Sequence, residues 1–325
     1  MAPTLRLTIL TLFILTQAPS ASLFGQSASE AAGRKIIRFD QQLFQAIEAE
    51  SNDSVAKLGS RYPQYMKIYC DGVVNRSPQL LLNFFSNKFL RTLYSDALNK
   101  FTDVSELEQS IFAAFDSLKA IGGTSVIPKV YMHVSGMNQS IVVGDGFISI
   151  SIDKYMGADF PMYKRYLPEY QSRQMVPRKI VSDCIRAWLY TEYPFTARDK
   201  SLREYMLYEG RILVVMSKIF PEEQWPVMLG YDEHEWAWAN NNVNNLWDYF
   251  NKKNLWINQD PNTIVRYMNE APSSTFLAPD APDRLGLFLG WKVADRYWKA
   301  ASPRTIHDGM KANATTILSA IGTME

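Results

Sequence analysis

The sequence predicts a mostly helical α+β fold, in which a helical cap precedes a small antiparallel sheet packed with helices. Three observations carry this prediction. Amphipathic helical patterns fill residues 34–121, β-branched runs follow between residues 129 and 153, and apolar helices are expected at Val176–Glu192 and Leu202–Phe220. With 325 residues, 47% of them hydrophobic and 13% aromatic, the chain can bury one large core or two smaller ones.

Residues 1–26 are interpreted as a secretory signal peptide. Arg6 precedes the apolar run Leu7–Leu15, which is too short to cross a hydrocarbon layer of ~30 Å as a helix. We expect cleavage after Ser22 or after Gln26. No cysteine lies directly after the apolar run, so an acylated N-terminal cysteine is not expected. The mature chain is therefore predicted to be periplasmic or associated with the cell envelope, without a transmembrane helix.

The formal net charge of +1 argues against nucleic acid as a partner, since phosphate backbones are bound by concentrated basic surfaces. Export would permit a disulfide between Cys70 and Cys184, the two cysteines of the chain. Their apolar helical surroundings instead favour two buried free thiols.

Residues 34–121 are predicted to form an N-terminal helical region. Ile37, Leu43 and Ile47 recur at helical spacing. Ser105-Glu-Leu-Glu108 has the form of a capping box, which predicts a helix start. Glycines at 122 and 123 then break the pattern, so a second region is expected over residues 125–325.

Strands are predicted at Lys129–Ser135, Ile141–Gly146 and Phe147–Asp153, where β-branched and aromatic residues are frequent. Gly144-Asp-Gly146 separates the last two runs. Because its glycines tolerate positive φ angles, it predicts a tight turn and a β-hairpin.

The order of these features resembles the GldB family of gliding-motility lipoproteins. The resemblance rests on Arg61-Tyr-Pro-Gln-Tyr65, on the hairpin, on Tyr208-Glu-Gly210 and on Ala281–Trp291. The family itself resembles a degenerate relative of zinc-peptidase domains. The resemblance therefore implies a metallopeptidase-like (zincin-like) layout for residues 125–325.

Within that layout, the helix at Val176–Glu192 is the place for a zinc-binding His-Glu-x-x-His motif. The aligned positions hold Ser182, Asp183 and Arg186. Serine is a poor zinc ligand and arginine cannot be deprotonated to become one, so neither a metal nor a cofactor is expected. The acidic run Asp232–Glu235 surrounds one of three histidines and is interpreted as a helix start.

Glu209 lies in an apolar helical pattern beside Tyr208, at the position where related peptidases complete their metal site. A buried carboxylate needs a partner, and the expected partner is Arg186 or Arg284. The alternative is that Glu209 lies on an exposed edge of its helix. The candidate vestigial pocket comprises Ser182, Asp183, Arg186, Tyr208, Glu209 and Arg284.

The resemblance implies a non-catalytic component of the cell envelope, associated with gliding motility and its secretion machinery. Its expected partners are other envelope proteins of that apparatus. The alternative is a periplasmic hydrolase or peptidase that uses Asp183 and Glu209 as paired carboxylates.

Overall fold

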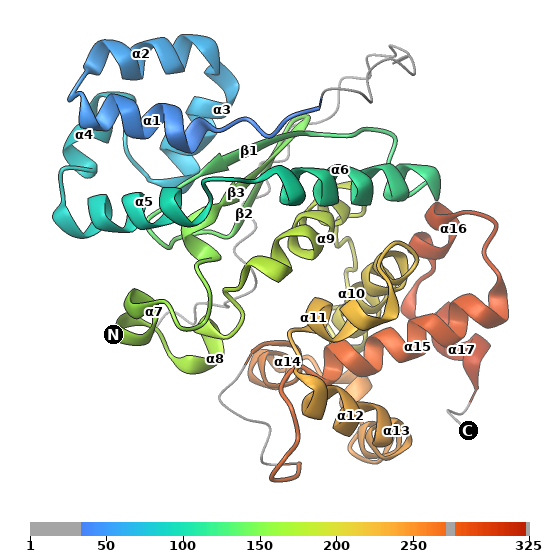
Figure 1. The fold of residues 1–325 in the computed structure, drawn as a ribbon. Helices are drawn as coiled ribbons and strands as arrows, with labels where there is room; N and C mark the ends of the chain where they lie inside the picture. The colour runs from blue at the N-terminus through green and yellow to red at the C-terminus, as the bar shows by residue number, and fades with distance from the viewer. Residues whose placement is uncertain (1–33, 271–276, 323–325) are drawn as a thin grey trace.

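The computed structural model describes residues 34–270 and 277–322, which form helices around a three-stranded sheet (Figure 1). The sheet contains β1 (Lys129–His133), β2 (Ile141–Gly144) and β3 (Phe147–Ser151). The helices before it are α1 (Phe39–Glu48), α2 (Asn52–Arg61), α3 (Pro63–Ile68), α4 (Leu81–Phe84), α5 (Lys88–Lys100) and α6 (Ser105–Ala120). The helices after it are α7 (Pro161–Tyr166), α8 (Glu169–Ser172), α9 (Ile180–Glu192), α10 (Leu202–Ser217), α11 (Trp225–Leu229), α12 (Glu233–Asn241), α13 (Val243–Lys252), α14 (Pro261–Met268), α15 (Leu285–Ala301), α16 (Ile306–Lys311) and α17 (Ala314–Ile321). The predicted mostly helical α+β class is confirmed.

The sheet is mixed, which corrects the prediction of an antiparallel sheet. β2 and β3 form the expected antiparallel hairpin, with Val142 opposite Ser149 and Gly146 at φ +69° in the turn. β1 instead pairs in parallel with β3 and places Tyr131 beside Ser149, so β3 is the central strand. An alternation of side chains specifies which face each residue occupies but not the direction of the neighbouring strand.

Helices cover both faces of this sheet. On one face the ring of Tyr65 from α3 stacks on Tyr131 at 4.2 Å, and its hydroxyl lies 2.9 Å from Ser149 Oγ. On the other face α9 packs against β2 and β3, and α6 packs on α9. Trp188 of α9 meets Phe115 of α6 edge to face at 6.1 Å. The hydrophobic core therefore runs from the N-terminal helices through the sheet into the second half of the chain.

The start of α6 differs from the expected capping box. Asp103 accepts hydrogen bonds from both the amide and the hydroxyl of Ser105, at 2.9 and 2.7 Å. Glu108 turns away from the helix start and accepts from the amide of Ile36 at 2.8 Å and from Lys35 Nζ at 2.7 Å. The carboxylate that was expected to cap α6 therefore fixes the chain segment leading into α1.

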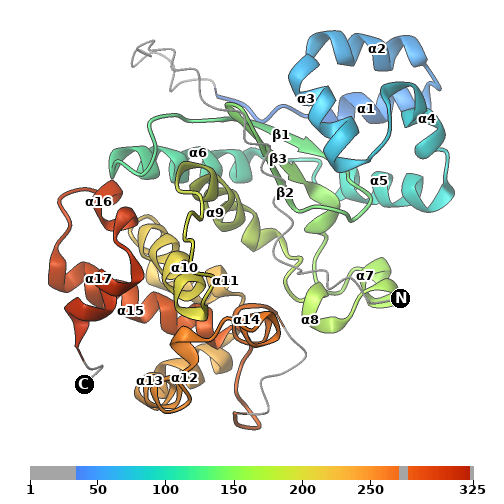
Figure 2. The ribbon, with the colours of Figure 1, turned by 180° about the vertical axis from the view of Figure 1, so that it is seen from behind.

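The C-terminal helices surround the pair formed by α10 and α15, which lie side by side in both ribbon views (Figure 2). Two glycines set their separation. A Cβ on Gly210 would lie 2.2 Å from the carbonyl oxygen of Gly290, and a Cβ on Gly290 would lie 2.1 Å from that of Met206. The helix backbones are therefore in direct contact, as small residues at a crossing allow.

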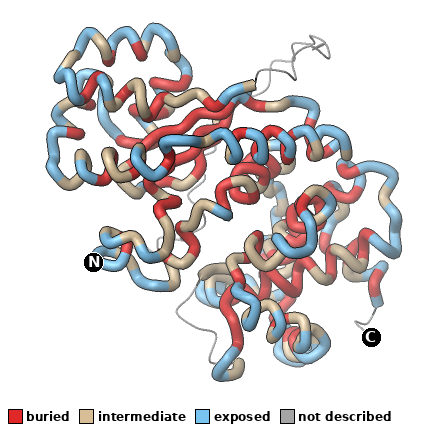
Figure 3. Tube along the Cα trace, viewed as in Figure 1, coloured by how far each residue is buried: buried red, intermediate tan, exposed pale blue. Residues whose placement is uncertain are grey.

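Buried positions concentrate along the sheet and on the inner sides of α9, α10 and α15 (Figure 3). Cys70 and Cys184 are both buried free thiols, as their surroundings favoured. Across residues 34–270 and 277–322, every helix falls short of the length and apolarity needed to span a bilayer. The predicted signal peptide lies outside the described residues.

Candidate functional site

A line of polar side chains runs along one side of α9 and the turn before it. Lys179, Asp183, Arg186 and Tyr190 recur every three or four residues and therefore share a helix face. Each of the four is buried or half-buried. We call them the α9 polar stripe. Buried polar groups need hydrogen-bond partners. The partners of each member therefore show whether its side chain is held by the fold or is free to bind a ligand.

The first half of the stripe is bonded to the segments that precede α9. Tyr155 donates its hydroxyl to Asp183 at 3.0 Å, and Ser182 Oγ donates to the carbonyl of Lys179 at 3.0 Å. Lys179 Nζ donates to Gln174 Oε1 at 2.9 Å. Burial lowers the pKa of Lys179, because desolvation disfavours its charged form.

Glu209 of α10 is bound by a tyrosine rather than by the expected arginines. The Tyr190 hydroxyl lies 2.9 Å from Oε1 and 2.7 Å from Oε2 of the carboxylate. Within the described residues, Glu209 forms no ion pair with Arg186 or Arg284. Burial raises the pKa of Glu209, and this outweighs the opposing effects of the nearby Arg186 charge and the Tyr190 hydrogen bond.

The two arginines bind other groups. Arg186 Nη2 donates to the carbonyl of Met228 at 2.6 Å, which ties α9 to the end of α11. Arg284 Nε donates to Asp283 Oδ1 at 2.9 Å, and its Nη2 lies 3.4 Å from the carbonyl oxygen of Gly230. Gly230 has φ +76°, and a Cβ there would lie 2.7 Å from Arg284 Nη2. Glycine is therefore required for this approach.

The structure groups some of the candidate residues and separates others. Asp183 and Arg186 share the α9 polar stripe, which reaches Glu209 through Tyr190. Lys179 and Tyr190 were not predicted as site residues from the sequence. Their helical spacing from Asp183 is a signal that could have placed them on the same face of α9. Tyr155 left no such signal, since its contact with Asp183 joins positions 28 residues apart.

We expect Tyr190 and Glu209 to stabilise the packing of α9 on α10 as a pair. Tyr190→Phe should lower the free energy of unfolding by ~1–3 kcal/mol, because a half-buried carboxylate loses its donor. Glu209→Gln should cost less, since a neutral amide oxygen still accepts from Tyr190 and is easier to bury. Denaturant unfolding of both single variants and of the double variant should give a coupling energy of at least ~0.5 kcal/mol.

Titration supplies a second readout of the same pair. The raised pKa of Glu209 means that the folded state binds its proton more tightly than the unfolded state. The parent should therefore lose stability relative to Glu209→Gln as the pH rises above ~4.5. Tyr166→Phe, at an exposed tyrosine, is the matched control and should change neither measurement. Additive effects of the two single changes would contradict the pairing.

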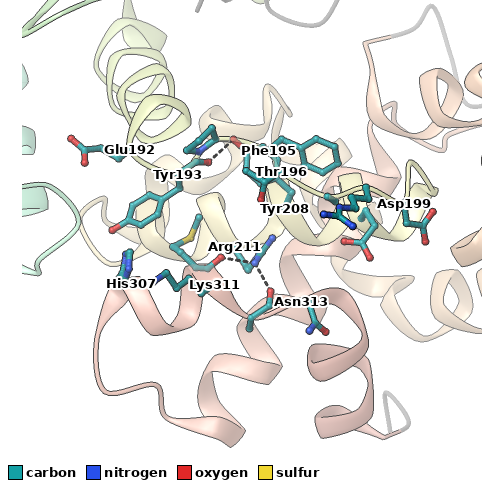
Figure 4. A pocket seen from close by; sticks show the side chains of 16 residues that line it. Glu192, Tyr193, Phe195, Thr196, Asp199, Tyr208, Arg211, His307, Lys311 and Asn313 are labelled. Carbon is teal, nitrogen blue, oxygen red and sulfur yellow. Dashed lines mark hydrogen bonds between the residues drawn. The ribbon is translucent and has the colours of Figure 1, made fainter. Parts of the chain in front are cut away.

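A pocket of about 450 Å³ lies beyond the C-terminal end of α9 (Figure 4). It is lined by residues 192–199, by one side of α10, and by the junction of α16 with α17. Tyr208 lines this pocket and donates its hydroxyl to the carbonyl of Tyr193 at 2.9 Å. Ser182, Asp183, Arg186, Glu209 and Arg284, the remaining members of the expected vestigial pocket, do not line it.

Metal-binding side chains are dispersed in the part of the chain that the structure describes, where no three His, Cys, Asp or Glu residues are grouped to hold an ion. His133 lies in the core, with Nδ1 2.7 Å from Ser149 Oγ, and burial lowers its pKa to about 3. His234 and His307 are exposed. Asp232 begins α12 in a true capping box with Glu235, which confirms the predicted helix start.

Comparison with known families agrees with the order of elements and motifs described above. The family model described as "Gliding motility protein GldB" matches residues 26–321. The chain belongs to the GldB family. That membership links it to gliding motility. Searches of curated proteins and of solved structures each gave no match to this GldB-family chain.

Proposed function

We propose that this GldB-family chain is a non-catalytic component of the cell envelope, which acts in gliding motility and its secretion machinery by binding other envelope proteins. The main support is the bonding of the groups that the resemblance assigns to the metal-site positions of a zinc peptidase. Asp183 accepts from Tyr155, and Arg186 donates to the Met228 carbonyl. Glu209 accepts from Tyr190.

Each of these bonds joins α9 to a different neighbouring segment. In a hydrolase with paired carboxylates, the acid and the base must both face one substrate-binding site. Asp183 and Glu209 instead bind tyrosines that lie before and within α9, respectively. Their hydrogen bonds favour a role in fixing the packing of the helices, which leaves the outer surface of the protein to bind partners.

Two measurements on the purified chain separate this role from the hydrolase alternative. We expect no chelator-sensitive peptidase turnover and no stoichiometric zinc by elemental analysis. We also expect in-cell cross-linking to capture envelope proteins, with the same partners for the parent and for Asp183→Asn.

The alternative predicts the opposite pattern. Stoichiometric zinc together with turnover that both a chelator and Asp183→Asn abolish would overturn the non-catalytic role. Glu209→Gln is the second variant, because it removes the other carboxylate of the proposed pair and keeps the hydrogen bond from Tyr190. Retained turnover in both variants would place any activity elsewhere in the chain.

A further inference from the structure

The pocket beyond α9 is bordered by a stretch of chain outside the helices and strands, residues 193–199, which we call the rim segment. Its exposure alternates: Tyr193, Phe195 and Ala197 are half-buried, whereas Pro194 and Thr196 are exposed. This period of two is typical of an extended strand. The Tyr208 hydroxyl anchors the start of the rim segment through the carbonyl of Tyr193.

The backbone in the middle of the rim segment is unpaired. Counting every described residue as a potential partner, the amides of Phe195, Thr196 and Ala197 donate no hydrogen bond, and their carbonyls accept none. An extended segment with free donors and acceptors is a template for pairing with another strand. Proteins use such edges to bind peptides by strand addition.

Arg211 lies in the middle of the pocket lining, between Tyr193 on one side and Asp199 on the other (Figure 4). Its Nε donates to the carbonyl of Leu207 at 3.1 Å. Its Nη1 donates to the carbonyls of Met310 and Ala312 at the end of α16. These bonds fix the guanidinium, while Nη2 has no partner among the described residues and is not sealed from solvent.

Arg211 also has no direct ion-pair partner among the carboxylates of the described residues, although Glu204, which lines the same pocket, attracts its charge from a distance. The carboxylates of Glu192 and Asp199 point away from it (Figure 4), and Asp199 is bound to Arg203 at 3.0 Å. Burial lowers the pKa of Arg211, because desolvation disfavours its charge. A fixed, half-buried guanidinium with a free donor is complementary to a carboxylate.

We propose that this pocket binds the carboxyl-terminal segment of a partner polypeptide, with the terminal carboxylate on Arg211 and the peptide backbone paired to the rim segment. The inference rests on the proposed function, since the occupant is a partner protein. The aromatic side chains of Tyr193, Phe195 and Tyr208 form the walls beside the last residues of the bound chain. The terminal carboxylate is the direct ion-pair partner that Arg211 lacks among the described residues, and the peptide backbone pairs with the free amides of the rim segment.

The test uses two synthetic pools of acetylated hexapeptides that are identical in composition, one with free carboxyl termini and one with amidated termini. Each pool is passed over the immobilised full chain, and retained peptides are quantified by mass spectrometry. We expect at least tenfold greater retention of the free-carboxyl pool. Arg211→Gln should abolish this preference, and succinate in excess should not displace the retained peptides, because it lacks the backbone that pairs with the rim segment.

Arg211 also holds the end of α16, so its variant can lose binding by loosening the fold. Thr196→Pro and Ala197→Pro avoid this difficulty, because each removes an amide that the fold does not use. Adjacent amides of a strand point in opposite directions, so at least one of the two changes should reduce retention tenfold. Thr196→Ala keeps the amide, and full retention is expected for it.

Equal retention of the two pools, or unchanged retention in both proline variants, would overturn the proposal. If envelope partners still cross-link to Thr196→Pro and Ala197→Pro in cells, the pocket inference fails while the binding role stands. Retained peptides recovered in cleaved form would support the pocket and contradict the non-catalytic role. If succinate alone displaced the retained peptides, the pocket would be a site for small dicarboxylates. The proposed occupant, the carboxyl terminus of a partner, would then be wrong.

Discussion

Gly290→Ala should destabilise the protein by about 3 kcal/mol or more, because the new methyl group has no space between α10 and α15. Its Cβ would lie 2.1 Å from the carbonyl oxygen of Met206 and 2.6 Å from the carbonyl carbon. Both atoms belong to helix backbone, so no side-chain rotation can relieve the clash and the helices must separate. Denaturant unfolding monitored by tryptophan fluorescence measures the loss.

Gly59→Ala in α2 is the matched control. There the nearest heavy atom to the added Cβ is Met66 Cγ at 3.9 Å, an ordinary contact. Since alanine also restricts the unfolded chain, this variant should gain about 0.5–1 kcal/mol. If both substitutions had the same effect, the close approach of α10 to α15 would be wrong.

Acid should unfold the protein in a way that depends on His133. The side chain is fully buried in β1, and burial lowers its pKa to about 3 from an ordinary value near 6.5. Below pH 6.5 the unfolded state therefore binds a proton on His133, whereas the folded state does not until the pH approaches 3. Between pH 7 and pH 4 this difference should remove about 3 kcal/mol of stability, at ~1.4 kcal/mol per pH unit below 6.5.

His133→Phe should flatten this part of the pH profile, because a phenyl ring carries no proton. Ser149, the present partner of His133, keeps its hydrogen bond with Tyr65 at 2.9 Å. His234→Phe on the surface of α12 is the control, and its stability curve should run parallel to that of the parent. Parallel curves for His133→Phe and the parent would show that other groups govern acid unfolding.

Most helices could be predicted because their apolar spacing and turn residues agree. The expected helix at Val176–Glu192 is α9, although α9 begins at Ile180. Pro177 explains why Val176 is not helical, since a proline disfavours the helical conformation in the residue before it, and Pro177–Lys179 form a 3-10 turn ahead of α9. Val176 is accordingly extended, at φ −119° and ψ 143°.

The pairing of strands and of buried polar groups could not be predicted from local pattern. The parallel position of β1 beside β3 depends on the path of the chain between them. Likewise, the sequence indicated that Glu209 needs a partner. It could not show that Tyr190, and not Arg186 or Arg284, lies within hydrogen-bond distance of the carboxylate in the folded chain. A sequence indicates that a buried charge needs compensation, whereas packing decides which donor is near enough.

The central position of β3 constrains the order in which the chain can acquire its structure during synthesis. β1 and β2 each pair with β3 and not with each other, so no two of the three strands can pair until residues 147–151 are present. The Tyr65 hydroxyl can form its hydrogen bond only after Ser149, 84 residues further along the chain, has been synthesised. Contacts at such separations raise the contact order and slow folding. A fragment that ended at Ile121 would leave the aromatic side of α3 open to water, so the N-terminal helices are expected to acquire native packing only after the hairpin has emerged.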